Sequence, residues 1–375
     1  MKTILILGTA YPYRGGLAAY NERIAAEFIT QGHSVQIITF TLQYPSFLFP
    51  GATQYSSEPA PKKILIHRKI NAINPFNWIK VGWLIKKQRP DIVLIKYWLP
   101  FMGPCFGTIA RIAKSNKHTN IISIIDNIIP HEKRPFDTLF TKYFTASVHR
   151  FISMSSSVQR DLKRHFYRTS ALVPHPIYDN YGSKINKQTA CDLLQINTQK
   201  YLLFFGIIRK YKGLDLLLEA MADKRLEAFD IHLIVAGEYY DDAAYYQQII
   251  EKKQLQNRVL LHTHFIPDSQ VAQYFGAADL VVQPYRNATQ SGITQMAYHF
   301  ETPMIVTNVG GLQEMVQHEH TGYVCKANSQ SIADAIFRFY TDLQAEQLTN
   351  NVAEQKKQYS WKRMTDAVLN DTNPT

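Results

Sequence analysis

Cysteine is scarce in this chain of 375 residues, and its placement excludes several kinds of site. The three cysteines, Cys105, Cys191 and Cys325, lie far apart, and none has a second cysteine at the spacing of a C-x-x-C redox or zinc motif. We therefore expect no disulfide, no structural metal and a reducing compartment. A hydrophobic content of 46% and a charged content of 19% are typical of a globular protein with sizeable cores.

A long apolar run is missing at the N-terminus. The apolar segment 3–8, with only Lys2 as a nearby charge, is too short for the apolar region of a signal peptide or for a membrane span. We expect the mature chain to begin at Met1 and the protein to be cytoplasmic. Repeats of 20–50 residues and low-complexity tracts are also absent, which argues against a solenoid.

Acidic residues are few in the first half of the chain. Through Tyr178 there are 23 Lys and Arg against 8 Asp and Glu, whereas the remainder has 18 against 22, so the halves carry +15 and −4. The large positive net charge of the first half favours a polyanionic partner, either nucleic acid or an anionic membrane surface. The alternative is a surface of solvated lysines.

Short runs rich in Ile, Val and Leu alternate with helix-length amphipathic stretches. The first series of expected strands is 3–8, 35–40, 91–96, 120–126 and 150–154, and the second is 201–206, 231–237, 258–262, 279–283 and 303–307. Runs that are apolar on both faces indicate buried parallel strands with helices on either side. We therefore predict two doubly wound, Rossmann-like α/β domains facing each other across a cleft.

The expected boundaries follow from the turn-rich stretch after Pro174-His175-Pro176. We predict a first domain at 1–178, a linker at 179–198, a second domain at 199–355 and a helical tail at 356–375 that packs back on the first domain. Beyond Ser329 only helices are expected. Since ligands of doubly wound sheets bind at the carboxyl ends of the strands, the site should lie in the loops that follow them.

The loop after the first strand contains Gly15 and Gly16 before an expected helix near Leu17. Paired glycines allow the backbone to approach a ligand, and the helix N-terminus favours an anion. The spacing is not G-x-G-x-x-G, so a dinucleotide fingerprint is absent. The alternative is a tight turn without a ligand.

The sharpest motif is the basic loop 206–213, Gly-Ile-Ile-Arg-Lys-Tyr-Lys-Gly, where a strand ends and a leucine-rich helix begins. The guanidinium of Arg209 can donate two parallel hydrogen bonds to a diphosphate, and the ammonium of Lys212 can bind it as a compact positive charge. The alternative is two solvated loop cations. The helix after Gly213 shows Leu214, Leu217, Leu218 and Met221 at helical spacing.

A third element is the segment 290–294, in which Ser291 is a candidate N-cap for a helix whose N-terminus can donate to a phosphate or a sugar hydroxyl. The alternative is that Ser291 only caps the helix and that no ligand binds there. The expected donor-binding residues are Gly15, Gly16, Gly206, Arg209, Lys212, Gly237, Glu238, Phe265, Ile266, Gln290, Ser291, Gly292, Ile293, Thr294 and Gln295.

Asp126 ends an apolar strand of the first series, and His131 and Glu132 follow shortly after. A carboxylate and an imidazole at a strand end can position a sugar hydroxyl or steady charge at an anomeric carbon. Either can also be an ordinary turn residue. We expect the catalytic group to consist of Arg209 and Lys212 with Asp126 or His131, and which of the last two acts stays open. His175 is expected to be structural.

Basic and aromatic residues mix in the segments 76–89 and 160–168, where Trp78, Trp83 and Tyr167 lie among lysines and arginines. This mixture suits a bilayer interface or a nucleic-acid backbone. Core helices with solvated cations are the alternative.

Together these motifs resemble the retaining, GT-B-fold glycosyltransferases of family four, the large bacterial group that builds cell-surface polysaccharides. The loop with Gly15 and Gly16 resembles the family's glycine loop, and 206–213 matches its G-x-x-R-x-x-K-G diphosphate clamp. The segments 278–284, 302–306 and 309–316 follow its C-terminal pattern in order. The resemblance implies a nucleotide-sugar donor on the C-terminal domain, retention of anomeric configuration, no cofactor or metal, and often a lipid-linked acceptor.

Two departures from the family pattern stand out. The usual pair of Glu residues separated by seven positions falls between Tyr285 and Ala297, where this chain has no acid, so Gln290, Thr294 or Gln295 are the neutral candidates to replace them. In the family, the first Glu contacts the donor sugar and the second contacts the ribose. Family members also commonly carry His where this chain has Asp126.

We predict a retaining glycosyltransferase that moves a sugar from a nucleotide sugar to a glycan or lipid-linked saccharide, peripheral on the inner face of the cell membrane, in cell-surface polysaccharide synthesis. A catalytically inactive nucleotide-sugar-binding partner, suggested by the missing acids, and a nucleotide-sugar epimerase are the alternatives. Nucleic-acid binding is a weaker one, and we expect no nucleic-acid partner. Donor, acceptor, linkage and oligomeric state stay open.

Overall fold

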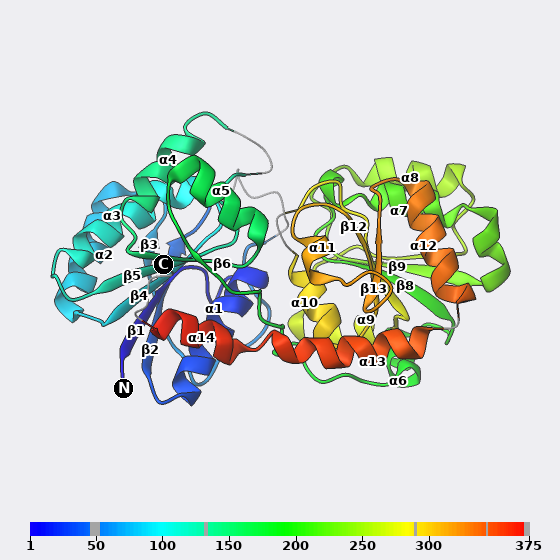
Figure 1. Ribbon diagram of the computed structural model, residues 1–375, viewed down its shortest axis with the longest axis horizontal. Coiled ribbons are helices and arrows are strands. Elements are labelled where there is room, and N and C mark those ends of the chain that lie inside the picture. The colour runs from blue at the N-terminus through cyan, green and yellow to red at the C-terminus, as the bar shows by residue number, and fades with distance from the viewer. Residues whose placement is uncertain (46–52, 131–133, 289–290, 343, 371–375) are drawn as a thin grey trace. The chain divides into compact units, whose positions relative to one another are not determined.

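The computed structural model describes residues 1–45, 53–130, 134–288, 291–342 and 344–370 (Figure 1). The chain divides into two compact units. Unit 1 contains Met1–Pro176 and Trp361–Thr375, and unit 2 contains Ile177–Ser360. Each unit is built around its own parallel sheet and is described separately.

The sheet of unit 1 has seven strands in the order β3-β2-β1-β4-β5-β6-β7. All neighbouring strands pair in parallel. The strands are β1 (Thr3–Leu7), β2 (Ser34–Leu42), β3 (Leu65–Asn71), β4 (Ile92–Tyr97), β5 (Asn120–Ile125), β6 (Arg150–Ser153) and β7 (Ala171–Leu172). The chain turns back at β1, where the strand order reverses, and this is where doubly wound sheets bind ligands.

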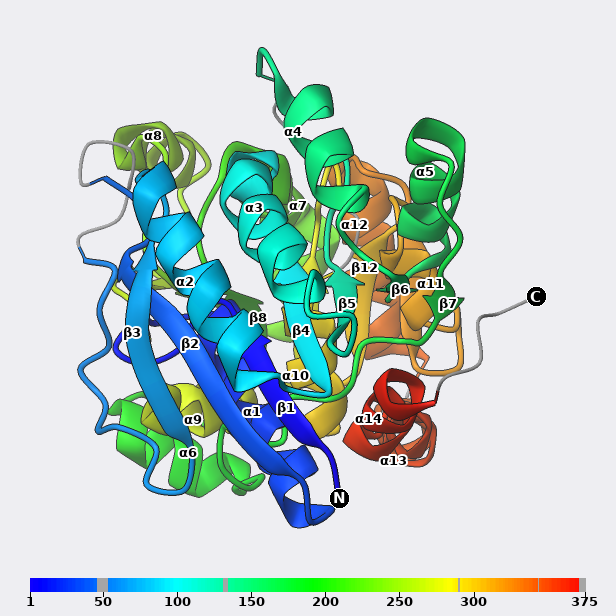
Figure 2. The same cartoon turned by 90° about the vertical axis from the view of Figure 1, so that its left-hand side faces the viewer.

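Helices cover both faces of this sheet because its strands are apolar on both sides. The helices of unit 1 are α1 (Gly16–Thr30), α2 (Pro75–Gln88), α3 (Gly103–Lys114), α4 (Asp137–Thr145), α5 (Ser156–Phe166) and α14 (Trp361–Leu369). In Figure 2, α2 and α3 lie side by side over the sheet, and α3 also packs on α4. Asn74 and Ser155 cap α2 and α5 by accepting from backbone N–H groups.

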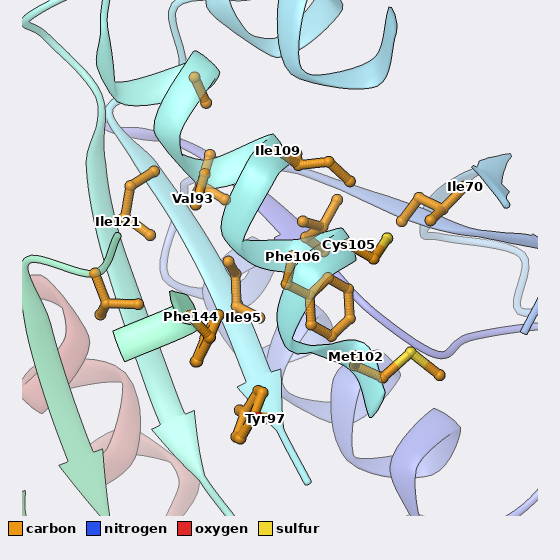
Figure 3. Packing of buried hydrophobic residues seen from close by; sticks show 14 of the residues in the cluster. Ile70, Val93, Ile95, Tyr97, Met102, Cys105, Phe106, Ile109, Ile121 and Phe144 are labelled. Atoms are coloured by element: carbon orange, nitrogen blue, oxygen red, sulfur yellow. The ribbon is translucent and has the colours of Figure 1, made fainter. Parts of the chain in front are cut away.

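The core under these helices is formed by alternate residues of the central strands. Figure 3 shows Phe106 and Ile109 of α3 beside Val93 and Ile95 of β4. The ring of Tyr97 stacks on Phe144 of α4 with 4.2 Å between centroids. This packing fixes the carboxyl end of β4, where the strand passes into the loop region of unit 1.

The C-terminal helix α14 packs against α1 in unit 1. Arg150 donates to the carbonyl oxygens of Ala367, Val368 and Asn370, so a cation satisfies the carbonyls at the end of that helix. Trp361, the first residue of α14, lies 4.9 Å from the ring of Tyr20.

The sheet of unit 2 has six parallel strands in the order β10-β9-β8-β11-β12-β13. They are β8 (Lys200–Phe205), β9 (Ile231–Ala236), β10 (Val259–His262), β11 (Leu280–Gln283), β12 (Met304–Thr307) and β13 (Gly322–Cys325). The helices are α6 (Lys187–Leu194), α7 (Leu214–Met221), α8 (Ala243–Lys252), α9 (Val271–Ala277), α10 (Gly292–His299), α11 (Leu312–Met315), α12 (Ser329–Thr341) and α13 (Ala345–Gln355). The order reverses at β8.

Short 3-10 turns complete the described structure. They are η2 (Pro100–Met102), η3 (Lys210–Lys212), η4 (Lys224–Phe229), η5 (Asp268–Gln270) and η6 (Lys356–Gln358).

The two doubly wound sheets confirm the predicted fold class, and both expected series of strands form. Three strands escaped prediction. β3 has a polar, half-exposed sequence, while β7 and β13 are short strands at sheet edges. The expectation of helices alone after Ser329 holds among the described residues, because β13 ends just before that residue.

The division into units differs from the expected boundaries in two places. The predicted linker 179–198 contains α6, which packs on α9 and belongs to unit 2. The chain returns to unit 1 at Trp361 rather than at 356. Apolar residues within a polar, turn-rich stretch, such as Ala190 and Cys191, are buried against a helix that is distant in the sequence.

Candidate functional site

The loop that follows β8 makes backbone hydrogen bonds with the end of β9 and the loop after it, which extend the parallel pairing of these two strands. Gly206 donates from its backbone N–H to Ala236, and Ile208 donates to Glu238 with an N···O distance of 2.8 Å in both cases. Gly206 has φ +95° and Gly237 has φ +147°, and a β-carbon on Gly237 would lie 2.1 Å from the carbonyl oxygen of Gly206. The two glycines therefore bring the carboxyl ends of β8 and β9 into direct backbone contact.

Three of the predicted donor-binding residues meet at this strand end. A β-carbon on Gly206 would lie 3.2 Å from Cδ1 of Ile293 and 3.4 Å from Nζ of Lys212. Lys212 Nζ is also 5.6 Å from the ring centroid of the buried Tyr285. The basic loop and the start of α10, which are about eighty residues apart in the sequence, thus form one site in unit 2.

Arg209 and Lys212 are cations without an acidic partner. Within the part of the chain that the structure describes, no carboxylate lies within salt-bridge distance of either side chain, and the guanidinium of Arg209 lies 5.3 Å from the ring of Tyr240. Burial, and to a lesser degree the charge of Arg209, lower the pKa of Lys212 to about 8. Two neighbouring cations without a counter-ion favour the binding of an anion.

An ion pair between the buried Asp215 and the exposed Arg286 holds the basic loop in place. Asp215 on α7 accepts two hydrogen bonds of 2.7 Å from Arg286, and Arg286 donates to the carbonyl oxygen of Lys210. The backbone N–H of Lys210 donates to Asp241. Although burial opposes it, the hydrogen bonds and charge of Arg286 keep the pKa of Asp215 below its usual range.

The start of α10 has the capping arrangement that the sequence predicts. Ser291 Oγ accepts from the backbone N–H of Ile293 at 3.2 Å and lies 3.3 Å from the hydroxyl of Tyr285. A β-carbon on Gly292 would lie 2.9 Å from the ring of Tyr178, so only glycine fits there. Ser291 is therefore a helix cap that also contacts the wall of the lysine site.

The polar residues inside α10 differ in their partners. Thr294 is fully buried and its hydroxyl donates to Gln283 Oε1 at 3.1 Å, so it has a structural partner. Gln295 is 1% exposed, and its Oε1 has no hydrogen-bond partner among the described residues, while its Nε2 lies 3.9 Å from the sulfur of Met315. Gln290 lies outside the described residues.

The remaining predicted donor residues of unit 2 lie in the loops after β9 and β10. Glu238 is partly exposed and follows β9 directly, while Phe265 and Ile266 follow β10, with Ile266 buried. These positions are at the carboxyl edge of the same sheet as Arg209.

In unit 1, Gly15 has φ +94° and immediately precedes α1, which begins at Gly16. The loop before it is tied down, because Tyr11 donates from its backbone N–H to Glu22 and the amide of Asn21 donates to the carbonyl of Thr9. No side chain caps α1 within the described residues, and the helix N-terminus is formed by glycine backbone.

Asp126 follows β5 and lies beside the end of β4. Its Oδ1 accepts from Lys96 Nζ at 2.8 Å, and its side chain is 20% exposed whereas that of Lys96 is 2% exposed. His131 lies outside the described residues. His175 is buried with its Nδ1 2.6 Å from the carbonyl oxygen of Pro176.

Sequence reasoning missed several residues of these sites. Lys96, Asp215, Tyr285 and Arg286 have partners 30 or more residues away along the chain, apart from the contacts of Tyr285 with α10. A signal was nevertheless present for Lys96, which is the charged residue in the apolar segment 92–97.

Two further observations concern metal ions and the membrane. The described residues contain no group of three or more His, Cys, Asp or Glu side chains that can hold a metal ion. None of the helices in the described parts of the chain combines the length and apolar character needed to cross a bilayer.

Known sequence families match both units. The family described as Glycosyltransferase Family 4 matches residues 14–178, and the family described as Glycosyl transferases group 1 matches residues 189–358. An uncharacterized glycosyltransferase of Methanocaldococcus jannaschii is 23% identical over 386 aligned positions, which cover 96% of this chain and 95% of that protein.

Solved structures show the same fold. Sucrose-phosphate synthase from Thermosynechococcus elongatus superposes with a TM-score of 0.76 at 16% identity, and Anabaena HepE in complex with UDP-glucose superposes with a TM-score of 0.72 at 16% identity. Each match covers 98% of both chains. The architecture is therefore GT-B, and with consecutive family matches over both units this chain belongs to the retaining glycosyltransferases of family four.

Proposed function

We propose that this glycosyltransferase uses a nucleotide sugar whose diphosphate is held by Arg209 and Lys212. The observation that carries the proposal is that two cations without a carboxylate partner among the described residues lie at the carboxyl end of β8, beside the start of α10. A departing diphosphate needs preorganised positive charge. The HepE structure in complex with UDP-glucose has the same fold, which agrees with such a donor.

Backbone groups supply the second part of the proposed phosphate site. The N-terminus of α10 lies next to Lys212, as the distances from Gly206 to Ile293 and to Lys212 indicate. Helix N–H groups and the helix dipole stabilise a phosphate or a sugar hydroxyl. Gly16 at the start of α1 is the corresponding candidate in unit 1.

Gln295 is our candidate for the ribose contact that an acidic residue makes in the family. Its Oε1 is buried without a hydrogen-bond partner among the described residues, and a buried acceptor without a partner is costly unless a ligand donates to it. Gln295→Ala should weaken nucleoside diphosphate binding several-fold, whereas Thr294→Val should mainly lower the melting temperature. Equal affinity in wild type and Gln295→Ala would remove Gln295 from the site.

Asp126 is the proposed support for the reacting sugar, and His131 is the second candidate for that role. A carboxylate at the end of β5 can accept a hydrogen bond from a sugar hydroxyl and stabilise positive charge that develops at the anomeric carbon. We propose transfer without a metal ion, in which Arg209 and Lys212 neutralise the diphosphate.

The proposed acceptor is a glycan or a lipid-linked saccharide in cell-surface polysaccharide synthesis, reached at an anionic membrane surface. Large apolar side chains are exposed on α2 and just before and along α4: Phe76 (84%), Trp83 (52%), Phe136 (67%) and Leu139 (60%). Helix α2 also carries three lysines and no acidic residue, and Lys86 Nζ lies 4.4 Å from the ring of Trp83. Exposed aromatic and cationic side chains together suit the headgroup region of an anionic bilayer.

Flotation with vesicles of phosphatidylcholine and phosphatidylglycerol tests this surface. Phe76→Ser with Trp83→Ser should reduce the bound fraction by about tenfold or more, because each buried aromatic contributes roughly 1.5–3 kcal/mol. Tyr245→Ser, an exposed aromatic of unit 2, is the matched control and should bind as wild type does. Equal flotation of all three proteins would remove the membrane from the proposal.

One rival function has an observation in its favour. The family's two acidic residues are absent between Tyr285 and Ala297, which agrees with an inactive protein that binds nucleotide sugars without turning them over. A thermal-shift screen of nucleotide sugars identifies the donor, since a ligand at 100 times its dissociation constant adds about 2.7 kcal/mol of stability. Release of nucleoside diphosphate from that donor then separates an active transferase from an inactive partner.

A further inference from the structure

The buried ion pair of unit 1 has a role that the sequence did not suggest. Lys96 lies at the end of β4 with a side chain that is 2% exposed, and its Nζ is 2.8 Å from Oδ1 of Asp126. Asp126 is held at the end of β5, where its backbone N–H donates to Tyr97 at 2.9 Å. Lys96 belongs to β4 and Asp126 follows β5, so two neighbouring strands hold the two partners of the ion pair in place.

Aromatic groups cover the ammonium of Lys96. Its Nζ lies 3.4 Å from the ring centroid of Tyr20, a fully buried residue of α1. Tyr20 is in turn packed against His175 at 5.2 Å and Trp361 at 4.9 Å between ring centroids. The ring face attracts the cation, and the surrounding groups keep water away from it.

Asp126 provides the negative charge for this cation. Burial, with a smaller effect of the Lys96 charge, lowers the pKa of His175 to about 3, so the imidazole is neutral near pH 7 and adds no charge to the cluster. The described residues show no second carboxylate within salt-bridge distance of Lys96. Removing the carboxylate of Asp126 would take from the buried ammonium of Lys96 the negative charge at 2.8 Å, which is strongly unfavourable.

We propose that Lys96 is a positioning residue that holds the carboxylate of Asp126 in one orientation, so that Asp126 accepts a hydrogen bond from a hydroxyl of the reacting sugar. This inference rests on the proposed role of Asp126 in sugar transfer. It accounts for why a charge is buried at the end of β4, which is otherwise apolar. The partly exposed carboxylate is the end of the pair that can reach a ligand.

The two points where the chain passes between the units lie next to this cluster in the sequence. His175 precedes the passage at Pro176–Ile177, and Trp361 follows the passage at Ser360. Both rings contact Tyr20, which covers Lys96. Tyr20 therefore joins the ion pair to both connecting segments within unit 1.

The test measures release of nucleoside diphosphate from the nucleotide sugar that gives the largest thermal shift. In the full-length protein, Lys96→Met should lower kcat by about a hundredfold, while the nucleotide-induced thermal shift at Arg209 and Lys212 stays as in wild type. Lys163→Met, an exposed lysine of α5, is the matched control and should keep wild-type kcat. Lys96→Gln, which keeps a hydrogen-bond donor without the charge, provides the measurement if the Met variant does not fold.

A double-variant comparison separates positioning from a purely structural role. Adding Lys96→Gln to Asp126→Asn should cost less than a further twofold, because the lysine acts through the carboxylate.

The outcomes distinguish this inference from the proposed function. Near-wild-type kcat in a folded Lys96 variant, or multiplicative losses in the double variant, would overturn the positioning role while leaving the nucleotide-sugar proposal intact. No nucleoside diphosphate release and no thermal shift in the wild-type protein would instead refute the proposed function.

Discussion

Lysine occurs at the carboxyl edge of both sheets, but in opposite electrostatic settings. In unit 1, Lys96 is buried and its ammonium contacts Asp126 at 2.8 Å. In unit 2, Lys212 has no acidic partner among the described residues, and burial together with the charge of Arg209 lowers its pKa. A buried charge with a built-in partner orients that partner, whereas a desolvated charge without one is ready for a ligand. The following predictions test this contrast.

The largest effect is expected in unit 2 from removing both cations that are proposed to hold the diphosphate. Arg209→Ala with Lys212→Ala should lower the rate of nucleoside diphosphate release by about a thousandfold or more, because preorganised charge at the leaving group is lost. The thermal shift with the nucleotide should disappear as well. Lys210→Ala, an exposed lysine in the same loop, is the control. Normal turnover and normal nucleotide affinity in the double variant would show that the diphosphate binds elsewhere.

The glycine loops of the two units should respond differently to alanine. Gly237→Ala should lower the free energy of unfolding by about 3 kcal/mol, because the new β-carbon meets the carbonyl oxygen of Gly206 and φ is positive. Gly15→Ala should cost only about 1 kcal/mol, since no atom of the described structure lies within 4 Å of its β-carbon position. Thermal melts without ligand measure both, and similar costs would contradict the close contact between β8 and β9.

The two lysines should have opposite effects on the stability of the unliganded protein. Lys96→Met should lower the free energy of unfolding by about 2 kcal/mol at pH 7, because the ion pair between Lys96 and Asp126 is lost. Lys212→Met should raise it by about 1 kcal/mol, because the folded state then no longer desolvates an unpaired ammonium. Melting temperatures of the unliganded variants at pH 7 measure both changes. If both variants melt at a higher temperature than wild type, or both at a lower one, the two lysines do not differ in their effect on stability.

Nucleotide affinity should depend on pH through Lys212. The pKa of Lys212 is lowered to about 8 in the free protein, so its charge is present at pH 7 and mostly lost at pH 9. Binding of a nucleoside diphosphate should therefore weaken by about tenfold from pH 7 to pH 9. Lys212→Arg should bind with little change over this range, since arginine stays protonated. A wild-type affinity that is constant from pH 7 to pH 9 would show that Lys212 does not contact the anion.

The fold was largely readable from local patterns, and so was the position of the basic loop after a strand of unit 2. Ile, Val and Leu runs such as 120–125 indicate buried parallel strands because their residues are apolar on both faces. The spacing of Arg209 and Lys212 after a strand predicts a cation site that depends on a single loop. The alternation in β3 and the brevity of β7 and β13 gave no comparable signal, because edge strands need less apolar surface.

The ion-pair partners of charged side chains could not be predicted from local sequence patterns. Asp215 and Arg286 are 71 residues apart, and Lys96 and Asp126 are 30 residues apart. The local sequence marks Lys96 as a charge in an apolar strand, but it does not show that Lys96 has a carboxylate partner and that Lys212 has none among the described residues. Likewise, Thr294 and Gln295 are adjacent, yet only the folded structure shows that Thr294 donates to Gln283.

The sequence by itself determined the secondary structure periodicity, the charge difference between the two halves and the chemical identity of the basic loop. These properties depend on residues that are neighbours along the chain. Only the tertiary structure decided which cations are neutralised within the protein and which are left for a ligand. The reason is that ion pairs and desolvation depend on distances of a few ångströms between residues on different strands and helices, and these distances are set by the packing of the sheets.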